Sequence, residues 1–419
     1  MTETKKSSHF RNKNFLALWG GQTVSEVGSQ LTNLALPVFA VTMLNVNESQ
    51  MGFLNAASTA SFLLVGLIAG AWVDRWVKRR VMIWADVVRM LAILSVPVLY
   101  FSGVIQVWHL FLVAAIMGLA TVFFDVAYQS FVPIVVPKEQ IASANSSLET
   151  TNQLSTIGGP AIVGGLLSIV KAPALLVADS LTFLVSTISL SAIRDREVPK
   201  PKEERKKLRH EIAEGLKFVW NNKIIRAVSF TTSTSNLFST AQATLVPLVI
   251  LRDLHISPAV FGVIESIAAV GGLLGAVTAA KLSKAIGEGQ VIAYSAVLMG
   301  FTAFAPAIAA GSSQFVAIVV LCLGQFVGMF TVLTYNITQV SARQRLCPEH
   351  LLGRMNASIR FFVWGVMPIG ALISGAAATA FGIIPVLWFA AIGVFLSAIF
   401  VVVSPLSRMK HLPGAPANE

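Results

Sequence analysis

The chain has 419 residues, of which 55% are hydrophobic and only 12% are charged, and its mean hydropathy is +0.73. A soluble domain averages about 25% charged residues, so this composition and its long apolar runs exclude a soluble protein and indicate a polytopic membrane protein. The formal net charge of +11 does not indicate nucleic-acid binding, because the positive charge is confined to loops between the apolar runs.

Twelve apolar stretches are each long enough to cross a bilayer as a helix. They cover residues 15–43, 51–73, 82–101, 108–130, 143–170, 172–193, 224–250, 258–281, 291–311, 314–337, 353–379 and 384–404. We therefore predict an all-α membrane protein with twelve transmembrane helices. An even number of spans places both termini on the same side of the lipid bilayer.

The positive charges predict which side that is. Of the 31 Lys and Arg residues, all lie in or beside loops on the side of the termini except Arg89, Arg360, Lys171 and Arg252. Such loops are cytoplasmic in membrane proteins. The basic hairpin between the second and third spans, residues 74–80, is the most compact of them. We expect both termini in the cytoplasm.

The longest polar segment, Arg194 to Lys223, separates the first six spans from the last six. It ends in an amphipathic stretch whose apolar residues have helical spacing: Leu208, Ile212, Leu216 and Val219. We predict a linker with a helix on the membrane surface. The expected domains are an N-terminal six-helix bundle (1–193), this cytoplasmic linker (194–223) and a C-terminal six-helix bundle (224–419).

The two halves resemble each other in sequence. Four landmarks recur at a nearly constant offset of 210 or 211 residues: Pro37 and Pro247, Gly52 and Gly262, Gln129 and Gln339, Asn145 and Asn356. Six spans repeated in parallel around a linker are typical of the major facilitator fold, with two pseudo-symmetric bundles. The hairpin is asymmetric, because Lys284 and Ala285 occupy the positions that match Asp74 and Arg75.

Charged residues inside a bilayer cost about 2.5 kcal/mol or more each, so each one requires an explanation. Glu26 is the strongest functional candidate. It lies on one polar stripe of the first span, with spacing i, i+4, i+7 and i+11: Gln22, Glu26, Ser29 and Asn33. A polar stripe on a membrane helix faces a cavity or another helix. We interpret Glu26 as a protonatable group beside a substrate path, and a packed polar contact is the alternative.

Asp125 and Glu265 are further candidates for proton coupling. Asp125 shares its face of the fourth span with Thr121 and Gln129, and a role in helix packing is the alternative. Glu265 lies about two turns into the eighth span. It either titrates or pairs with Arg252 near the adjoining turn.

Four other charged residues lie near the cytoplasmic ends of spans. Asp86 and Arg89 are three residues apart on one helix and can pair with each other, as gate or packing charges. Glu149 and Arg360 occupy matching places in the two repeats, so we expect them to face each other as a cytoplasmic latch. Asp179 in the sixth span receives no role.

The seventh and tenth spans carry neutral polar residues: Ser235, Ser239, Gln242, Gln325, Thr331, Thr334 and Thr338. Uncharged hydrogen-bonding groups suit a large amphipathic ligand, and they also serve helix packing. No enzyme motif is present, no phosphate-binding glycine loop occurs, and Cys322 and Cys347 have no metal-ligand spacing. We predict no cofactor, no metal and an ion gradient as the energy source.

The hairpin resembles the major facilitator signature Gly-x-x-x-Asp-Arg-x-Gly-Arg-Arg/Lys. The matching residues are Gly70, Asp74, Arg75, Lys78 and Arg79, and Val77 replaces the second glycine. Other stretches resemble the drug:proton antiporter-3 subfamily of macrolide-efflux proteins and siderophore exporters: Ala85-Asp86 with Arg89, residues 124–130, 144–146 and 179–183. This resemblance implies that Asp74, Arg75 and Arg79 stabilise the closed cytoplasmic side.

Two departures from the family pattern affect the mechanism. Three residues rather than two separate Pro160 from Gly164-Gly165 in the element that resembles the antiporter motif of the fifth helix. The arginine that is usual in the fourth helix of many proton antiporters is absent, and the span carries Gly118 and Asp125 instead. Proton coupling would therefore depend on Glu26 or Asp125.

The resemblance implies a monomeric, multi-pass secondary transporter in the inner membrane of a bacterium. It would export amphipathic, drug-like small molecules, including macrolides, by proton antiport, and so contribute to multidrug resistance. Three alternatives remain open at this point: a siderophore or metabolite exporter, a lipid or lysolipid flippase of the same fold, and a non-transporting membrane scaffold or receptor. The polar stripe of the first span argues against the scaffold.

Overall fold

The computed structural model describes residue 10 and residues 12–73, 75–137, 140–194, 197, 208–348 and 351–410. The first half contains α1 (Lys13–Met43), α2 (Glu48–Val73), α3 (Lys78–Phe101), α4 (Val107–Val135), α5 (Ile141–Leu167) and α6 (Ala172–Ala192). Helix α7 (Leu208–Asn221) follows. The second half contains α8 (Lys223–Leu248), the π-helix η4 (Val249–Asp253), α9 (Pro258–Ile286), α10 (Glu288–Thr302), α11 (Ala305–Ala310), α12 (Gln314–Leu346), α13 (Leu352–Trp364), α14 (Met367–Phe381), α15 (Ile383–Ser397), α16 (Ile399–Val402) and the 3-10 helix η6 (Pro405–Arg408).

Local signals in the sequence determine where several helices begin. The Asn12 side chain accepts hydrogen bonds from the amides of Asn14 and Phe15 and so caps α1. Asn222 caps α8 in the same way, at the point where α7 ends. Ser257 caps α9, and the proline that follows it fits the first turn, where no amide donor is needed.

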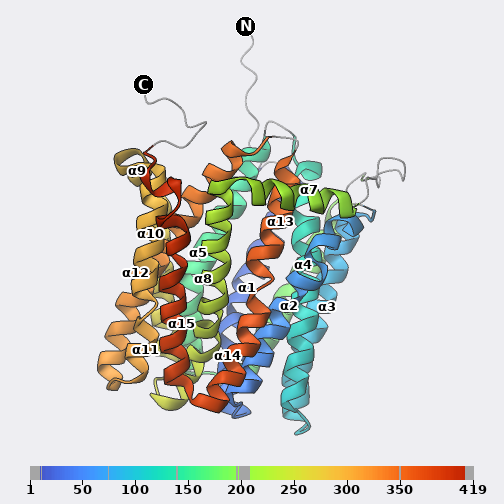
Figure 1. Ribbon diagram of the computed structural model, residues 1–419. Coiled ribbons are helices and arrows are strands. Elements are labelled where there is room, and N and C mark those ends of the chain that lie inside the picture. The colour runs from blue at the N-terminus through green and yellow to red at the C-terminus, as the bar shows by residue number, and fades with distance from the viewer. Residues whose placement is uncertain are drawn as a thin grey trace.

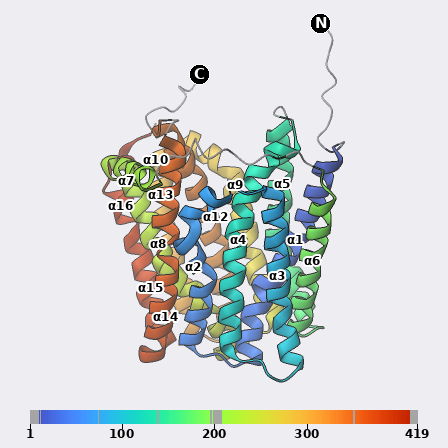
Figure 2. The ribbon, with the colours of Figure 1, turned by 90° about the vertical axis from the view of Figure 1, so that its right-hand side faces the viewer.

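The helices form two bundles side by side (Figures 1 and 2). In the first bundle α1 packs on α5 and α6, α2 on α4, and α3 on α4 and α6. In the second bundle α12 packs on α9 and α10, and α8 on α14 and α15. Every predicted span coincides with one long helix or with two consecutive shorter ones. The prediction of an all-helical major facilitator fold is confirmed.

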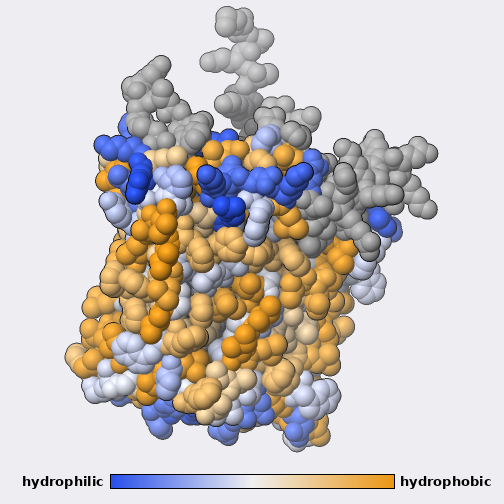
Figure 3. Space-filling model, in the orientation of Figure 1, coloured by the Kyte–Doolittle hydropathy of each residue, from blue (hydrophilic) through white to orange (hydrophobic). Residues whose placement is uncertain are grey.

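The surface agrees with a membrane position. Figure 3 shows, on the face in view, a hydrophobic band across the middle of the molecule and hydrophilic residues at its two ends. Within the described residues, nine helical stretches are long and apolar enough to cross a bilayer. Helices α1, α2 and α5 are not among these nine, although they have 31, 26 and 27 residues and cross the same bundle.

Both the start of α1 and the end of α16 lie at the end of the molecule where α7 runs across the surface (Figure 1). We call this the terminal end, and we call the other end of the bundles the opposite end. Helix α7 packs on α13 and α8, with Phe218 and Val219 beside the buried Ile225 and Met355. Helix α7 covers the stretch in which the sequence predicts an amphipathic helix, and residues 195–196 and 198–207 of the linker lie outside the described residues.

Candidate functional site

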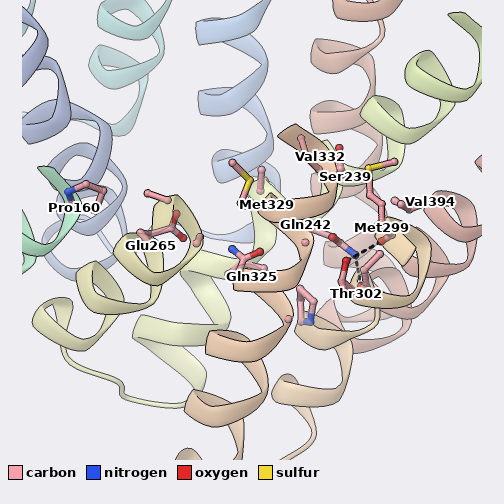
Figure 4. Close-up of a pocket in the computed structure, with 18 of the residues that line it drawn as sticks. Pro160, Ser239, Gln242, Glu265, Met299, Thr302, Gln325, Met329, Val332 and Val394 are labelled. Carbon is pink, nitrogen blue, oxygen red and sulfur yellow. Dashed lines mark hydrogen bonds between the residues drawn. The ribbon is translucent and has the colours of Figure 1, made fainter. Parts of the chain in front are cut away.

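A cavity of about 650 Å³ lies between the two bundles near the middle of the membrane-spanning part. Neutral polar groups and apolar side chains line most of it. Six of the coupling and cavity candidates predicted from the sequence line this cavity: Asn33, Ser235, Ser239, Gln242, Glu265 and Gln325. Figure 4 shows Glu265 from α9 and Gln325 from α12 beside this cavity, and the Gln242 amide donates a hydrogen bond of 2.6 Å to the carbonyl of Ala303.

A second cavity of about 740 Å³ continues the first one toward the terminal end. Thr232, Asn236 and Asn336 line both cavities. The second cavity extends to Gln344 at the end of α12 and Asn356 at the start of α13, both of which lie at the terminal end. The two cavities thus form one path from the middle of the protein to that end.

At the opposite end the bundles are held together by polar contacts from α2. Arg252 of η4 donates to Glu48 at a distance of 2.8 Å, and the hydroxyl oxygens of Ser49 and Thr379 are 2.7 Å apart. Burial of Glu48 by itself raises the pKa of its carboxylate. The hydrogen bond from Arg252, a backbone hydrogen bond and the attraction of the Arg252 charge together lower it by more, so the pKa of Glu48 lies below its usual value. Among the described residues, the polar contacts between the bundles lie on this side of the cavity.

Two glycine crossings bring the bundles into direct backbone contact on the same side. A β-carbon added at Gly164 of α5 would lie 2.8 Å from the Cα of Gly262 on α9. A β-carbon added at Gly375 of α14 would lie 2.9 Å from the Cα of Gly52 on α2. Small residues at a crossing let two membrane helices approach closely. These crossings seal the opposite end.

Apolar packing shows the same difference between the two ends. One buried cluster contains residues of both bundles, such as Val38 of α1 and Ile250 of η4. The buried clusters that include Met82 of α3 and Met355 of α13 each contain residues of one bundle only. The described structure is therefore closed at the opposite end and open at the terminal end.

Charges of opposite sign lie on the two walls of the second cavity. Asp125 of α4 is on the wall of the first bundle, and Arg343 and Arg360 are on the wall of the second bundle. The charges of Arg89, Glu26 and Arg360 all act on Asp125. No described residue forms a hydrogen bond with the Asp125 carboxylate. Gln129 lines the same wall one helical turn further along α4.

The polar stripe of α1 divides between two surroundings. The Gln22 amide donates to Glu26 at 2.7 Å, and Asn152 of α5 donates to the other carboxylate oxygen at 3.2 Å. Glu26 is therefore partnered between α1 and α5 and is not one of the residues that line the two cavities, whereas Asn33 lines the central cavity. Ser29, Thr121 and Thr331 are not among the lining residues either, and Thr331 is 1% exposed.

The structure places the predicted gate residues as follows. Arg89 pairs with Asp86 on α3, and its guanidinium lies 4.2 Å from the centroid of the Phe124 ring. Arg79 donates to the carbonyl groups of Ser191 and Ile193, where α6 ends. These contacts lie within the first bundle. Arg75 is exposed, and Asp74 lies outside the described residues.

The expected contact between Glu149 and Arg360 is not formed. Glu149 accepts a hydrogen bond of 2.6 Å from Gln153 on its own helix, and Arg360 lies over the Trp364 ring at 5.2 Å. The physical reason is that the bundles are apart at the terminal end, so the two side chains lie on separate walls. The alternative pairing of Glu265 with Arg252 is absent too, because Arg252 bonds Glu48 and Asp253.

Sequence reasoning missed several lining residues. Asn236 and Asn336 line both cavities, and Met299 and Met329 line the central one. Asn236 follows Ser235 directly, and its polar side chain within a predicted span was a signal that could have identified it. The two methionines gave no signal, because an apolar residue in a membrane span is equally compatible with lipid, core and cavity.

The chain is similar to known efflux proteins over nearly its whole length. The family model described as transmembrane secretion effector matches residues 4–419. Macrolide efflux protein A of Streptococcus pyogenes is 22% identical over 402 residues, which cover 95% of this chain and 97% of that protein. Multidrug efflux pump Tap of Mycolicibacterium fortuitum is 26% identical over 417 residues, which cover 94% of this chain and 97% of that protein.

Solved structures with the same fold include the nucleoside transporter NupG, with a TM-score of 0.76 and 12% identity over 93% of this chain and 99% of that chain. A bacterial homologue of the iron transporter ferroportin in an inward-facing state gives a TM-score of 0.73 at 16% identity, over 95% and 99% of the two chains. A bacterial homologue of ferroportin in an outward-facing state gives a TM-score of 0.57 at 17% identity, and the match covers 93% of this chain and 98% of that chain.

Proposed function

The chain belongs to the transmembrane secretion effector family of major facilitator transporters, and on this premise we propose that it exports amphipathic small molecules in exchange for protons. The observation that carries the proposal is the path between the bundles. It is sealed at the opposite end and continues to the terminal end, which is one of the two states that alternating access requires. The similarity to macrolide and multidrug efflux proteins supports export as the direction.

The distribution of positive charge supports the orientation. Lys and Arg gather in the loops of the terminal end, so this end faces the cytoplasm and the described state is open to the cytoplasm. Transport then requires the bundles 1–193 and 224–419 to rock about the central cavity, connected by the linker 194–223. In the other state the cytoplasmic ends meet and the opposite end opens to the outside.

The cavity supports a drug-like substrate rather than a small ion. A volume of about 650 Å³ is in the range that binds drug-sized molecules. Neutral amide and hydroxyl groups such as Asn33, Ser239 and Gln325 fix a polar group of the ligand, and the apolar remainder binds its hydrophobic part. Macrolides are therefore suitable first probes.

Proton coupling is assigned to Asp125 and Glu26. Asp125 faces the open cavity, and its carboxylate loses its charge when it binds a proton. Neutralisation changes its interaction with Arg343 and Arg360 on the facing wall, and so changes the balance between the two states. Glu26 acts on Asp125 through its charge and is connected to α5 through Asn152.

The test is transport in proteoliposomes with an imposed pH gradient and a radiolabelled macrolide such as erythromycin. We expect gradient-driven movement that a protonophore abolishes. Asp125→Asn and Glu26→Gln should each reduce the gradient-driven rate by about tenfold or more while binding stays within about threefold, because charge neutralisation removes the protonation step. Gln153→Ala is the matched control, because Gln153 lies next to Asn152 on α5, lines neither cavity and bonds Glu149 rather than Glu26. Undiminished gradient-driven transport in both acidic variants would refute the coupling.

A further inference from the structure

We propose that the central cavity binds amphipathic organic cations and that Glu265 provides the negative charge that pairs with them. This inference rests on the proposed function, because it names the chemical class of the exported molecule. It begins from one feature of the lining. Of the described residues that line the central cavity, Glu265 is the one Asp, Glu, Lys, Arg or His.

The Glu265 carboxylate has no protein partner. No residue in the described part of the chain forms a hydrogen bond or an ion pair with it, and Arg252, the nearest candidate in sequence, is engaged by Glu48 and Asp253. A charged group within a membrane protein is costly unless it is paired or reaches water in a cavity. Two buried acids in the spans have partners within the first bundle: Asp86 has Arg89, and Asp179 accepts from Thr32 and Thr182. Glu265 is left available for a ligand.

The surroundings of Glu265 suit a soft, apolar cation. Figure 4 shows Glu265 beside Gln325, with Met329 and Met299 further along the cavity. Thioether side chains are polarisable and adapt to ligands of different shapes. Phe261 and Tyr335 also line the cavity, and aromatic side chains are favourable neighbours for cations.

A metal ion fits this site less well than an organic cation. Hard divalent cations require several oxygen ligands, and transition metals require imidazole or thiolate groups in addition. The described residues contain no group of three or more His, Cys, Asp or Glu side chains that could hold a metal. One carboxylate in a large cavity lined by amides and thioethers matches a single, dispersed positive charge on a bulky molecule.

The second cavity differs from the central one in that it contains positively charged residues that can attract anions. Arg343 and Arg360 lie in the second cavity with Asp125, whereas the central cavity holds a negative charge only. An anionic amphipathic molecule would thus be attracted to the second cavity and repelled from the central one. Charge sign, rather than size, should decide which ligands reach Glu265.

Tetraphenylphosphonium and tetraphenylborate test this directly, because they have nearly the same size and shape and opposite charge. Binding of each ion to the purified full chain is measured by calorimetry. We expect the wild-type protein to bind the cation, and Glu265→Gln to weaken that binding by at least about tenfold while binding of the anion does not weaken. Glu265→Asp keeps the charge and should retain most of the affinity. Asp253→Asn, an exposed acid at the opposite end, is the matched control.

The inference is overturned if Glu265→Gln binds the cation as tightly as wild type does. Size-exclusion profiles of the variants establish that they are folded. Failure of the proposed function looks different. A protein that binds the cation through Glu265 but moves no ligand under a pH gradient supports this inference and refutes export by antiport. Gradient-driven transport of a macrolide without Glu265-dependent cation binding gives the reverse result.

Discussion

The acids within the membrane-spanning helices fall into two groups at the scale of single residues. Asp86 and Asp179 are fully buried and each has a partner, Arg89 for the first and Thr32 for the second. Inserting a charged side chain into a membrane costs about 2.5 kcal/mol or more, and contacts with such partners offset this cost. Asp179 joins α6 to α1, and Arg89, the partner of Asp86, lies over the rings of Phe124 and Phe183, so both acids have a structural role.

Asp125 and Glu265 belong to the second group, because each lies on a cavity wall without a hydrogen-bonding partner in the described chain. A charged carboxylate on such a wall is stable only where water reaches the cavity. When the path closes they lose that water, so they must gain a proton, a ligand or a cationic partner. This is why the transport and binding tests above concentrate on these two residues.

The ion pair between Glu48 and Arg252 stabilises closure at the opposite end, and Glu48→Gln should weaken it. Because the pKa of Glu48 is lowered in the closed state, its contribution is present above the usual pKa of a glutamate and is lost as pH falls through the lowered value. Between about pH 5 and pH 8 the wild-type contribution is therefore constant.

The Arg252 side chain is 40% exposed, so solvent limits the effect of Glu48→Gln to about 0.5 to 1 kcal/mol, or roughly a two- to fivefold shift toward the state open to the outside. The measurement is labelling of Asn33→Cys in the cavity by an impermeant maleimide added from outside. Asp253→Asn removes a contact of Arg252 within the second bundle only and is the matched control. Equal labelling rates in Glu48→Gln and wild type would contradict the assignment.

At the scale of helices, the two glycine crossings are related by the internal repeat. Gly52 and Gly164 in the first bundle match Gly262 and Gly375 in the second, at offsets of 210 and 211 residues. Each crossing joins the second span of one half to the fifth span of the other half. The seal at the opposite end is thus nearly symmetric, although the basic hairpin at the terminal end is not.

Gly164→Leu should prevent closure at the opposite end, because its β-carbon alone would clash with Gly262. Overpacking of this kind costs about 1 to 3 kcal/mol, so the state open to the outside should gain roughly five- to hundredfold. The same impermeant label at Asn33→Cys detects the change.

Gly165→Leu is the matched control for this prediction. It adds the same side chain one residue later, where nothing lies within 4 Å of the added β-carbon. We expect wild-type labelling in Gly165→Leu. If the two leucine variants label alike, the glycine crossing does not control closure.

The sequence predicts where the membrane-spanning helices lie better than it predicts where they are interrupted. The twelve spans were predicted from the apolar stretches of the sequence, and each one coincides with one helix or two consecutive helices. The interruptions were missed, although two of them coincide with prolines, Pro306 at the start of α11 and Pro368 at the start of α14. Proline fits the first turn of a helix, so it allows a new helix to begin without a loop.

The site was predictable in part for a physical reason. Polar residues such as Gln242 and Gln325 were recognisable because membrane spans contain few of them. Their facing partners were not recognisable, because the distance between the bundles depends on the conformational state. Glu149 and Arg360 illustrate this: the repeat aligns them, but the open terminal end separates them.

At the scale of the whole molecule, closure of the terminal end must bring the two walls of the second cavity together. Gln129 of α4 and Gln344 of α12 are exposed side chains on opposite walls of that cavity. The walls carry Asp125 on one side and Arg343 and Arg360 on the other, so their approach is electrostatically favourable. The motion therefore needs no new contacts between like charges.

Cysteine labelling tests both the orientation and this motion. In a background with Cys322→Ala and Cys347→Ala, Gln129→Cys and Gln344→Cys should react with an impermeant maleimide in inside-out vesicles and not in right-side-out vesicles. Ser102→Cys, in the loop after α3 at the opposite end, should show the reverse pattern. Labelling of Gln129→Cys from the outside only would overturn the orientation.

The same two cysteines report the closure. A short bifunctional reagent should join Gln129→Cys to Gln344→Cys slowly in the state described here, because the bundles are apart at the terminal end. Adding Gly164→Leu, which favours the state open to the outside, should increase the yield several-fold, since the two bundles move as units about the cavity. Adding Gly165→Leu should leave the yield unchanged. An unchanged yield with Gly164→Leu as well would mean that the two ends open independently, and rocking of the bundles would then be wrong.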